Sequence, residues 1–432
     1  MRGLLSSVVR ARTTEGESPA YRAILDLGTA QTKALVVQTQ GRESTILGAA
    51  AAPYEEGVSR ISGAPMDVLA MVRSCDRALR QAEQMTERCC GSQVVPDWVV
   101  LGVPNCLTAF LTHTVMHRRS EPGRRVTERE LGDVVKRAQR LALQELGDNV
   151  SPRLGHPEAK LELLETGLVG INVDGRSVTT PVGLNGETIA VTVFNVAVPA
   201  PYRTFLRTVA SELGLEILGV MSSWQALASA IPDRRAVCID VGGSGSDIVL
   251  VHSSRAWATA RVPLGGLDFT AQIAGALRLS PSDAERCKLA YSLGQLDIGL
   301  EERLRSALDE VLGEWLSGLE KALTPLCGLE GLPRQIVLCG GGSSLPGIVE
   351  TVGDHPWMTR LNCSGGPEVR SMLPEQVPGI LDGTGQLREA QYACAVALAA
   401  YATGGAAHPA DWGPFLSAVK RPDVFVESGV GT

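Results

Sequence analysis

The sequence lacks the marks of three common protein classes. Its longest apolar runs fall far short of a membrane span, which argues against a transmembrane chain. No Cys-x-x-Cys occurs among the ten cysteines, and no cysteine pair has zinc-ligand spacing with histidine, which argues against a zinc site. The pattern GxxxxGKS/T is also absent, so a nucleotide site in this chain would not be a P-loop.

A large excess of charge of one sign is missing as well. The 432 residues carry a net charge of −7, which excludes a whole-molecule electrostatic binder of nucleic acid. With 44% hydrophobic residues, this length supports a sizeable core and about two to four domains. Cys238, Cys339 and Cys394 lie in apolar runs, which indicates buried thiols and a reducing cytosol.

Neither end of the chain carries a convincing membrane or secretion signal. The start, MRGLLSSVVRAR, has too short an apolar core for a signal peptide. Its apolar residues between Leu4 and Val9 can share one helix face beside three arginines, which makes residues 1–20 a candidate membrane-touching segment. The alternative, which we favour, is a flexible N-terminus. Residues 403–432 are rich in Gly, Ala, Pro and Asp and predict a flexible tail.

Two stretches repeat one pattern of strand, aspartate, glycine-bearing turn and strand. The first is DLGTAQTK at 26–33, between strands predicted at 22–27 and 34–39. The second is DVGGSGSD at 240–247, between strands predicted at 236–241 and 248–251. This weak internal repeat predicts two related α/β domains that face one another.

A tight turn of Gly and Ser exposes several backbone N–H groups in one direction and so forms a nest for an anion such as phosphate. Each turn alone can be a plain hairpin, but the repetition, with a further glycine turn GGGSS at 340–344 after a third strand, favours phosphate. Asp26 and Asp240 are expected to hold Mg²⁺ through water. The predicted phosphate-binding residues are Gly28, Thr29, Ala30, Lys33, Gly242, Gly243, Ser244 and Gly245.

Periodicity and capping signals predict the remaining elements. Thr127 and Glu130 have the spacing of a capping box that opens a helix, and Gly214 is a C-cap signal. Other helices are expected at 66–86, 202–213, 267–278, 282–292, 301–323 and 388–402, and strands at 98–103, 161–166, 170–173, 189–198 and 335–339.

These motifs together resemble the actin-like ATPase superfamily. LDLGTAQTKALVV (25–37) and IDVGGSGSDIVLV (239–251) resemble its two phosphate loops, and IVLCGGGSSLPGI (336–348) resembles its adenosine motif. The resemblance implies an α/β, actin-like ATPase fold of two facing lobes, with ATP and Mg²⁺ as cofactors. DAERCKLAY (283–291) resembles the segment that touches adenine and ribose, so the implied adenosine-binding residues are Glu285, Lys288, Gly340, Gly341, Gly342 and Ser343.

Gln225 lies where the superfamily places a residue that orients the attacking water. The resemblance therefore implies a catalytic, water-positioning role for Gln225. The alternative is a glutamine on a helix surface.

Within the superfamily the chain resembles the FtsA family over roughly residues 22–402. The stretches at 63–85, 181–186 (PVGLNG) and 224–231 (WQALASAI) resemble FtsA segments. The implied division is a flexible N-terminus 1–20, subdomain 1A at 21–97 and 191–233, an FtsA-type inserted subdomain 1C at 98–190, subdomain 2A at 234–272 and 330–402, subdomain 2B at 273–329, and a flexible tail 403–432.

Two departures from the family pattern stand out. Family members usually carry Gly-Gly-Gly-Thr in the second loop, where this chain has Ser244-Gly245; the serine hydroxyl still donates, so nucleotide binding is expected. The family's C-terminal end is a basic amphipathic membrane helix. Here Pro414 and Pro422 interrupt the apolar tail, which makes it a poor anchor.

The resemblance implies an ATP-binding cytoskeletal protein of bacterial cell division with slow or absent ATP hydrolysis. Its partners would be an FtsZ-like, tubulin-like division protein and further copies of itself, with no nucleic acid. Its location would be the cytoplasm, with peripheral contact to the inner face of the cell membrane left open. A relative that binds nucleotide without hydrolysing it also stays open because of Gly245.

The first alternative is a PilM-like cytoplasmic adaptor of type IV pilus assembly. The second is a small-molecule kinase, which needs an aspartate base; Asp133 and Asp174 resemble helix-surface and turn residues instead. His113 and His117 lie in a strand-like segment and are expected at the surface. The nearby basic cluster of Arg118, Arg119, Arg124 and Arg125 can meet a partner or lipid headgroups, or form a solvated loop.

Overall fold

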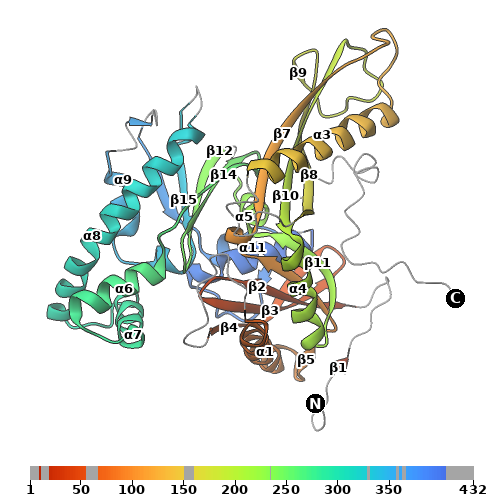
Figure 1. Cartoon of the computed structure of the whole chain (residues 1–432). Coiled ribbons are helices and arrows are strands. Elements are labelled where there is room, and N and C mark those ends of the chain that lie inside the picture. Colours follow the sequence, from red (N-terminus) through yellow and green to blue (C-terminus); the bar gives the residue numbers. More distant parts are fainter. Residues whose placement is uncertain are drawn as a thin grey trace.

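Two β-hairpins with glycine loops stand at the centre of the molecule. The computed structural model describes residues 9–10, 19–54, 67–149, 160–233, 235–327, 331–356, 360–361 and 366–404. Each hairpin belongs to its own mixed sheet, and a third sheet forms a projecting part that we call the arm (Figure 1).

The first hairpin joins β2 and β3 within a six-stranded sheet. β2, β3 and β4 run antiparallel, while β6 lies parallel to β2 and β11 parallel to β6. The helices α1 (Val68–Met85) and α4 (Ala200–Glu212) bury their apolar faces against this sheet. In sheet order the strands are β11 (Glu216–Ser222), β6 (Trp98–Val103), β2 (Ala20–Leu27), β3 (Gln31–Gln40), β4 (Glu43–Pro53) and β17 (Leu381–Asp382).

The second hairpin repeats this topology in a five-stranded sheet. β12, β13 and β14 run antiparallel and β15 lies parallel to β12, as β6 does to β2. The strands in order are β14 (Arg255–Val262), β13 (Ser246–His252), β12 (Arg235–Val241), β15 (Gln335–Cys339) and β16 (Glu368–Ser371). The helices of this lobe are α6 (Gly266–Leu277), α7 (Pro281–Ser292), α8 (Ile298–Leu323) and α9 (Ile348–Asp354).

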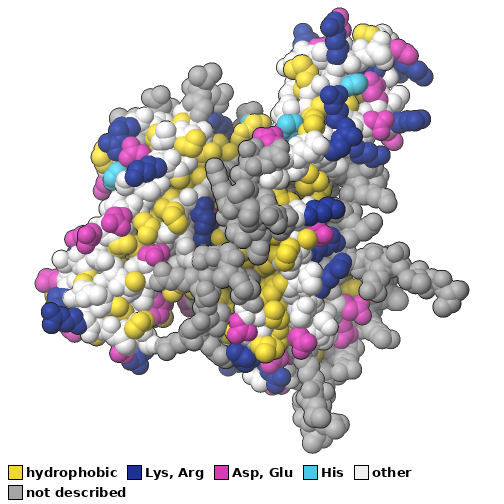
Figure 2. All heavy atoms as spheres, in the orientation of Figure 1, with side chains coloured by type: hydrophobic (Ala, Val, Ile, Leu, Met, Phe, Trp, Pro, Cys, Tyr) yellow, Lys and Arg dark blue, Asp and Glu magenta, His cyan; other side chains and the backbone are white. Residues whose placement is uncertain are grey.

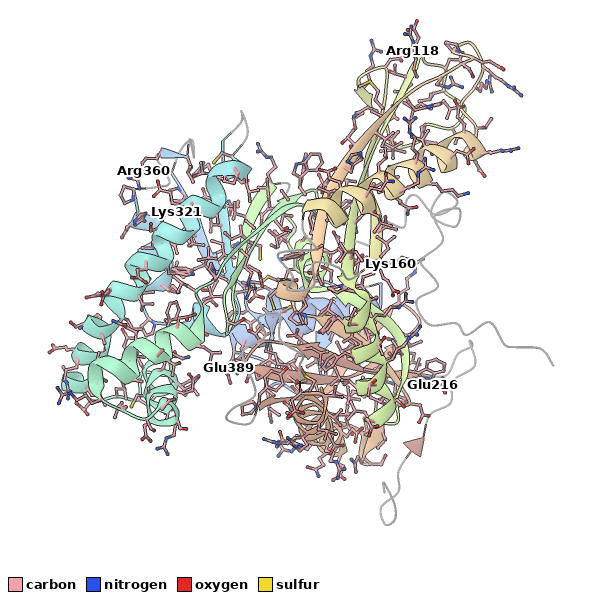
Figure 3. The ribbon with its side chains drawn as sticks, viewed as in Figure 1. Arg118, Lys160, Glu216, Lys321, Arg360 and Glu389 are labelled. Carbon is pink, nitrogen blue, oxygen red and sulfur yellow. The ribbon has the colours of Figure 1, made fainter. Side chains whose placement is uncertain are left out.

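Two buried helices join the lobes. α5 (Ser223–Ala230) and α11 (Ala393–Ala402) pack against each other and share one core with residues of both sheets. Cys238, Cys339 and Cys394 are buried in this core, as predicted. Figure 3 labels Glu389, which precedes α11, where the two lobes meet.

The arm is a four-stranded antiparallel sheet covered by α3 (Glu128–Asn149). It has a core of its own, which includes Val115, Leu131 and Ile171. Its strands in order are β7 (Ala109–Arg118), β10 (Thr188–Pro199), β8 (Leu161–Val173) and β9 (Arg176–Ser177). Lys and Arg side chains are spread over its outer end (Figure 2), where Figure 3 labels Arg118.

The arm corrects part of the sequence interpretation. Arg119 is 5% exposed and donates to Glu130 over 2.7 Å, so it does not belong to a solvated basic loop, whereas Arg118, Arg124 and Arg125 are exposed. The predicted capping box is half present, because Thr127 Oγ1 accepts from the Glu130 N–H while the Glu130 carboxylate binds Arg119. His113 and His117 lie on strand β7 and are half-buried.

Two element boundaries were also wrong. The strands predicted at 161–166 and 170–173 are one strand, β8, which continues through a register shift against β10. The predicted helix 388–402 begins only at Ala393, after a 3₁₀ turn at Ala390–Tyr392. The other predicted helices and strands are found within a few residues of their predicted bounds.

Most of the two segments predicted to be flexible lies outside the residues that the structure describes. Val9 and Arg10 form β1, which pairs parallel with β5 (Val94–Val95), so Val9 is not on a helix face. The rest of the predicted N-terminal segment and residues 405–432 lie outside the described residues. No helix within the described ranges is long and apolar enough to cross a membrane.

The remaining helical elements are short. They are α2 (Glu87–Cys90), η1 (Asn105–Leu107), η3 (Thr324–Leu326), η4 (Gly341–Ser344) and η5 (Pro374–Gln376).

Candidate phosphate-binding site between the two hairpin loops

The first loop (28–30) and the second loop (242–245) touch each other across the two lobes. The backbone N–H of Ser244 donates to Thr29 Oγ1 over 2.9 Å. A Cβ atom on Gly243 would lie 2.6 Å from the Ala30 Cβ, so only glycine permits this approach. The structure therefore brings together the two turns that the sequence repeat singled out.

The first hairpin places an acid and a cation opposite each other. Asp26 faces Lys33 across the β2–β3 register, and Lys33 Nζ donates to Asp26 Oδ2 over 3.1 Å. Burial opposes the charge on Lys33, but Asp26, Cys394 and Asp240 together outweigh it, with Asp26 the largest of the three, so the pKa of Lys33 is raised. The Tyr54 hydroxyl donates to Gly28 O over 2.9 Å and holds the loop from below. Lys33 is thus a fixed positive charge beneath the first loop.

The second hairpin places two acids opposite each other. Asp240 faces Asp247 across the β12–β13 register. Burial and the Asp247 charge raise the pKa of Asp240 to about 7, and the charges of Lys33 and Asp26 also act on it. Asp26 and Asp240 therefore share one electrostatic environment although they belong to different lobes. Facing carboxylates that resist ionisation fit a nearby divalent cation.

The structure gives such a cation no complete set of protein ligands. Within the described residues, no group of three or more His, Cys, Asp or Glu side chains is arranged to hold a metal directly. This arrangement fits Mg²⁺, which keeps several waters and is held by substrate phosphates with one or two carboxylates. The predicted role of Asp26 and Asp240 in contacting those waters stays a prediction.

Gly265 and Gly266, at the start of α6, hold the second loop in place. The N–H groups of Gly266 and Leu267, at the start of α6, donate to Gly242 O and Gly243 O over 2.8 and 2.9 Å. A Cβ on Gly265 would lie 2.5 Å from Gly242 O. These contacts with the second loop were not predicted, although Gly265-Gly266 directly precedes a predicted helix.

The third loop (340–344) packs against the strand end that carries Asp240. Gly340 has φ +83°, and a Cβ there would lie 2.1 Å from Asp240 Oδ1. Ser343 Oγ donates to Gly340 O over 2.7 Å, and a Cβ on Gly342 would lie 2.4 Å from Val241 Cγ1. Gly341, the next residue, opens η4. All three glycine loops thus converge on one place.

Glu285 and Lys288 lie together on α7, on the side of the second loop. Lys288 is buried; its Nζ donates to Glu285 Oε2 over 2.7 Å and to Gly266 O over 2.8 Å. Since Gly266 in turn binds Gly242, a continuous hydrogen-bonded path joins α7 to the second loop. The adenosine-binding role of the pair stays a prediction.

Gln225 does not lie where its predicted role requires. It is buried in α5, and its Oε1 accepts from the Ala256 N–H over 3.1 Å. Ala256 is six residues along β14 from Val262, which pairs with Ser246 at the loop, a separation of roughly 20 Å. The side chain is therefore neither on a helix surface nor beside the second loop.

The α5 residue next to the site is Ser223. Its hydroxyl donates to Val103 O over 3.2 Å and bonds to Cys394, whose neighbours include Asp26 and Asp240. The sequence similarity of this short helix does not determine which of its residues faces the glycine loops. The prediction therefore chose Gln225, whereas the structure places Ser223 nearest to them.

Trp315 is fully buried in α8. It also has a polar contact that the sequence did not signal. Its indole N–H donates to Ser246 Oγ over 2.8 Å, and that hydroxyl donates to Leu264 O over 2.9 Å. The end of the second loop is thus tied to the long helix of its lobe.

Two facing lobes with a repeated hairpin, paired glycine loops and a connecting helix pair define an actin-like ATPase fold, as the sequence predicted. The structure matches a chain of a solved "PilM-PilN type IV pilus biogenesis complex" with a TM-score of 0.61 and 19% identity. The match covers 89% of this chain and 98% of that chain. This likeness concerns the fold.

Sequence comparison narrows the class. The profile of the family "Cell division protein FtsA" matches residues 237–397. "Cell division protein FtsA" of Pseudomonas aeruginosa is 26% identical, over 83% of this chain and 84% of that protein. The protein of the same name from Bacillus subtilis is 23% identical, over 76% of this chain and 75% of that protein. The chain is therefore similar to FtsA proteins over most of its length and shares its fold with a PilM chain.

Proposed function

We propose that this chain is an ATP-binding bacterial cell-division protein of the FtsA kind. It binds ATP with Mg²⁺ between its lobes, associates with further copies, and links filaments of an FtsZ-like division protein to the inner face of the cell membrane. The observation that carries the proposal is the direct contact of Ser244 with Thr29, because it brings two anion-binding turns to one point.

In this proposal the phosphates enter between the first and second loops and take over the Ser244 N–H from Thr29. The glycines of both loops offer backbone N–H groups, and Lys33 supplies a fixed positive charge. Asp26 and Asp240 orient the waters of Mg²⁺, which neutralises phosphate charge when bound. Glu285 and Lys288, beside the second loop, receive the adenosine.

Turnover in this proposal is slow or absent. Phosphoryl transfer needs a residue that positions the attacking water, and Gln225 is engaged with Ala256 instead. Ser223 is a weak substitute, because a hydroxyl near neutral pH is a poor base. ATP then acts mainly as a ligand that holds the lobes together.

Nucleotide binding is tested with a matched pair of glycine variants. Gly340 and Gly347 both have positive φ, at 83° and 78°, but a Cβ at Gly340 meets Asp240 whereas one at Gly347 meets nothing within 4 Å. Gly347→Ala carries the strain of a left-handed residue, of about 1–2 kcal/mol, and Gly340→Ala carries more, because at ψ 167° its backbone lies in a region that essentially only glycine adopts. We expect calorimetric titration with ATP and Mg²⁺ to show binding by the wild type and by Gly347→Ala, and strongly weakened binding by Gly340→Ala. A wild type that binds no ATP would overturn the proposal.

The fold match also supports a second candidate, a PilM-like adaptor recruited by a membrane partner. Sedimentation with lipid vesicles, with and without ATP and Mg²⁺, separates the two. ATP-dependent pelleting of the full chain that is lost on removal of residues 1–18 supports the division protein. No pelleting in any condition supports the soluble adaptor.

The kinase alternative has little support from the arm's acids. Asp174 Oδ1 accepts from the N–H groups of Glu187 and Thr188 over 2.9 and 2.8 Å, so it holds the turn together. Asp133 is exposed on α3. Neither residue has the position of a catalytic base near the glycine loops.

A further inference from the structure

The two hairpins differ at one equivalent position. In the first hairpin Asp26 faces Lys33, and in the second Asp240 faces Asp247, with the same spacing of seven residues. The second lobe therefore has an acid where the first lobe has its cation. Without another positive charge, the second loop would present two carboxylates to a polyphosphate, which is unfavourable.

The neighbouring strand supplies that charge. Arg261 on β14 faces Asp247 on β13, and its Nη1 donates to Asp247 Oδ1 over 2.7 Å. The equivalent position of the first sheet, opposite Lys33 on β4, is Ala51. Each hairpin thus has one cation at its loop end. In the first lobe this is Lys33 on the hairpin strand β3, and in the second lobe it is Arg261 on the neighbouring strand β14.

The guanidinium is aimed at the loop rather than at solvent. Arg261 Nη2 donates to Ser244 Oγ over 3.1 Å, and Ser244 is the residue whose N–H reaches across to Thr29. The Arg261 side chain is 25% exposed. A guanidinium has five N–H donors in a planar fork, so the bonds to Asp247 and Ser244 do not exhaust it.

Gly245 makes room for this arrangement. A Cβ at Gly245 would lie 2.6 Å from Arg261 Nη2 and 2.8 Å from the backbone oxygen of Val262. A side chain at position 245 would therefore push the guanidinium off the loop. The missing side chain at position 245 and the position of Arg261 beside the second loop therefore belong to one local arrangement.

We infer that Arg261 is a phosphate-binding residue, the second lobe's counterpart of Lys33. The inference rests on the ATP binding proposed above. When phosphate enters between the loops, Asp247 keeps hold of the guanidinium while the contact with Ser244 Oγ gives way to phosphate oxygens. Arginine suits this role because its fork binds phosphate through two parallel hydrogen bonds.

Arg261→Gln tests the inference, with binding of adenosine, AMP, ADP and ATP (each with Mg²⁺) measured by calorimetry. We expect ATP affinity to fall about 10- to 100-fold, adenosine affinity to stay unchanged, and the loss to grow with the number of phosphates. The matched control is Arg255→Gln on the same strand, where the guanidinium donates to Val169 O in the arm. That control should bind ATP like the wild type.

A merely structural role predicts a different pattern. If Arg261 only neutralises Asp247, the ATP affinity lost in Arg261→Gln should return in the double variant Asp247→Asn/Arg261→Gln, because no unpaired carboxylate then faces the phosphates. If Arg261 itself binds phosphate, the double variant should still bind ATP weakly. We expect Asp247→Asn to keep or improve ATP affinity, because it frees the guanidinium and removes a negative charge. ATP affinity that returns in the double variant, or equal losses for adenosine and ATP, would overturn the inference.

The result separates this inference from the proposed function. A wild type that binds no ATP removes both, whereas unchanged ATP binding by Arg261→Gln removes this inference alone. If the glutamine variant fails to fold, Arg261→Lys is used instead. This variant keeps the positive charge but lacks the planar fork of donors. We expect its affinity for ATP to fall several-fold and its affinity for adenosine to stay unchanged. Unchanged ATP affinity in the lysine variant would then count against the inference.

Discussion

Burial and neighbouring acids raise the pKa of Asp240, whereas neighbouring cations lower it. Its pKa is raised to about 7 by burial and by Asp247 across the hairpin, whereas an unfolded aspartate ionises near pH 4. Between these values the folded chain binds a proton that the unfolded chain has lost. Folding stability should therefore fall as pH rises from about 4 to 7, the reverse of a salt-bridged aspartate.

Asp240→Asn should remove this pH dependence. The variant keeps the shape of the side chain but never ionises, so it should gain stability relative to wild type as pH rises from 4 to 8, by at most about 4 kcal/mol. Thermal unfolding across this pH range measures the difference. The control is Asp309→Asn, an exposed residue of α8. Parallel curves for wild type and Asp240→Asn would show that Asp240 ionises normally.

The contacts at the candidate site that could be predicted join residues close in the chain or repeat one local pattern. The Asp26–Lys33 pair and the glycines of the two loops are close in the chain, so their spacing alone predicts that they meet. Arg261 and Ser223 were missed because their contacts depend on strand register and helix orientation. Gly340 was predicted for adenosine, but its close approach to Asp240 joins residues 100 positions apart and required the fold.

At the scale of elements, one carboxyl group joins three of them. Glu165 on β8 of the arm accepts from the Tyr401 hydroxyl on α11 over 2.7 Å and from the Ser222 N–H on β11 over 3.2 Å. Burial raises the pKa of Glu165 to about 7, although both hydrogen bonds favour its ionised form. The base of the arm is thus fixed by a group that titrates near neutral pH.

Tyr401→Phe should loosen this junction in a pH-dependent way. The lost hydroxyl leaves a buried carboxylate short of a donor above pH 7, but matters less below pH 6, where Glu165 in the folded chain is protonated. We expect a loss of about 1–3 kcal/mol at pH 8 and a smaller one at pH 5.5, measured by denaturant unfolding. Tyr21→Phe on β2 is the control. An equal loss at both pH values would exclude Glu165 as the cause.

Element prediction failed where a glycine had a packing role. The predicted break between the strands 161–166 and 170–173 begins at Gly167, where a Cβ would lie 2.1 Å from Phe194 Cε1 on β10. The glycine lets the ring pack, and β8 runs on past it through an irregular register. Periodicity predicted the helices well because amphipathic faces are local, whereas a strand interrupted by glycine is ambiguous without its partner.

At the scale of the whole molecule, the lobes meet through few polar contacts at the loops. The Ser244 N–H donates to Thr29 Oγ1, and Gln31 Nε2 donates to Gln391 Oε1 over 2.6 Å just before α11. The hairpin of each lobe was predictable because its two strands and glycine turn are adjacent in the chain. The mutual placement of the lobes was inferred only from the repeat, since these contacts join residues 215 and 360 positions apart.

Because the proposed ligand spans both lobes, it should stabilise the whole chain through phosphate and metal together. At a hundred times its dissociation constant, ATP with Mg²⁺ should add about 2.7 kcal/mol to the free energy of unfolding. EDTA should remove most of this gain, since the carboxylates of Asp26 and Asp240 then face the phosphates without the metal that neutralises phosphate charge. Thermal unfolding with ATP, AMP and no nucleotide, each with and without EDTA, measures the effect. An equal gain with AMP or in EDTA would mean that the ligand rests on one lobe and that the contact between the glycine loops has no part in binding.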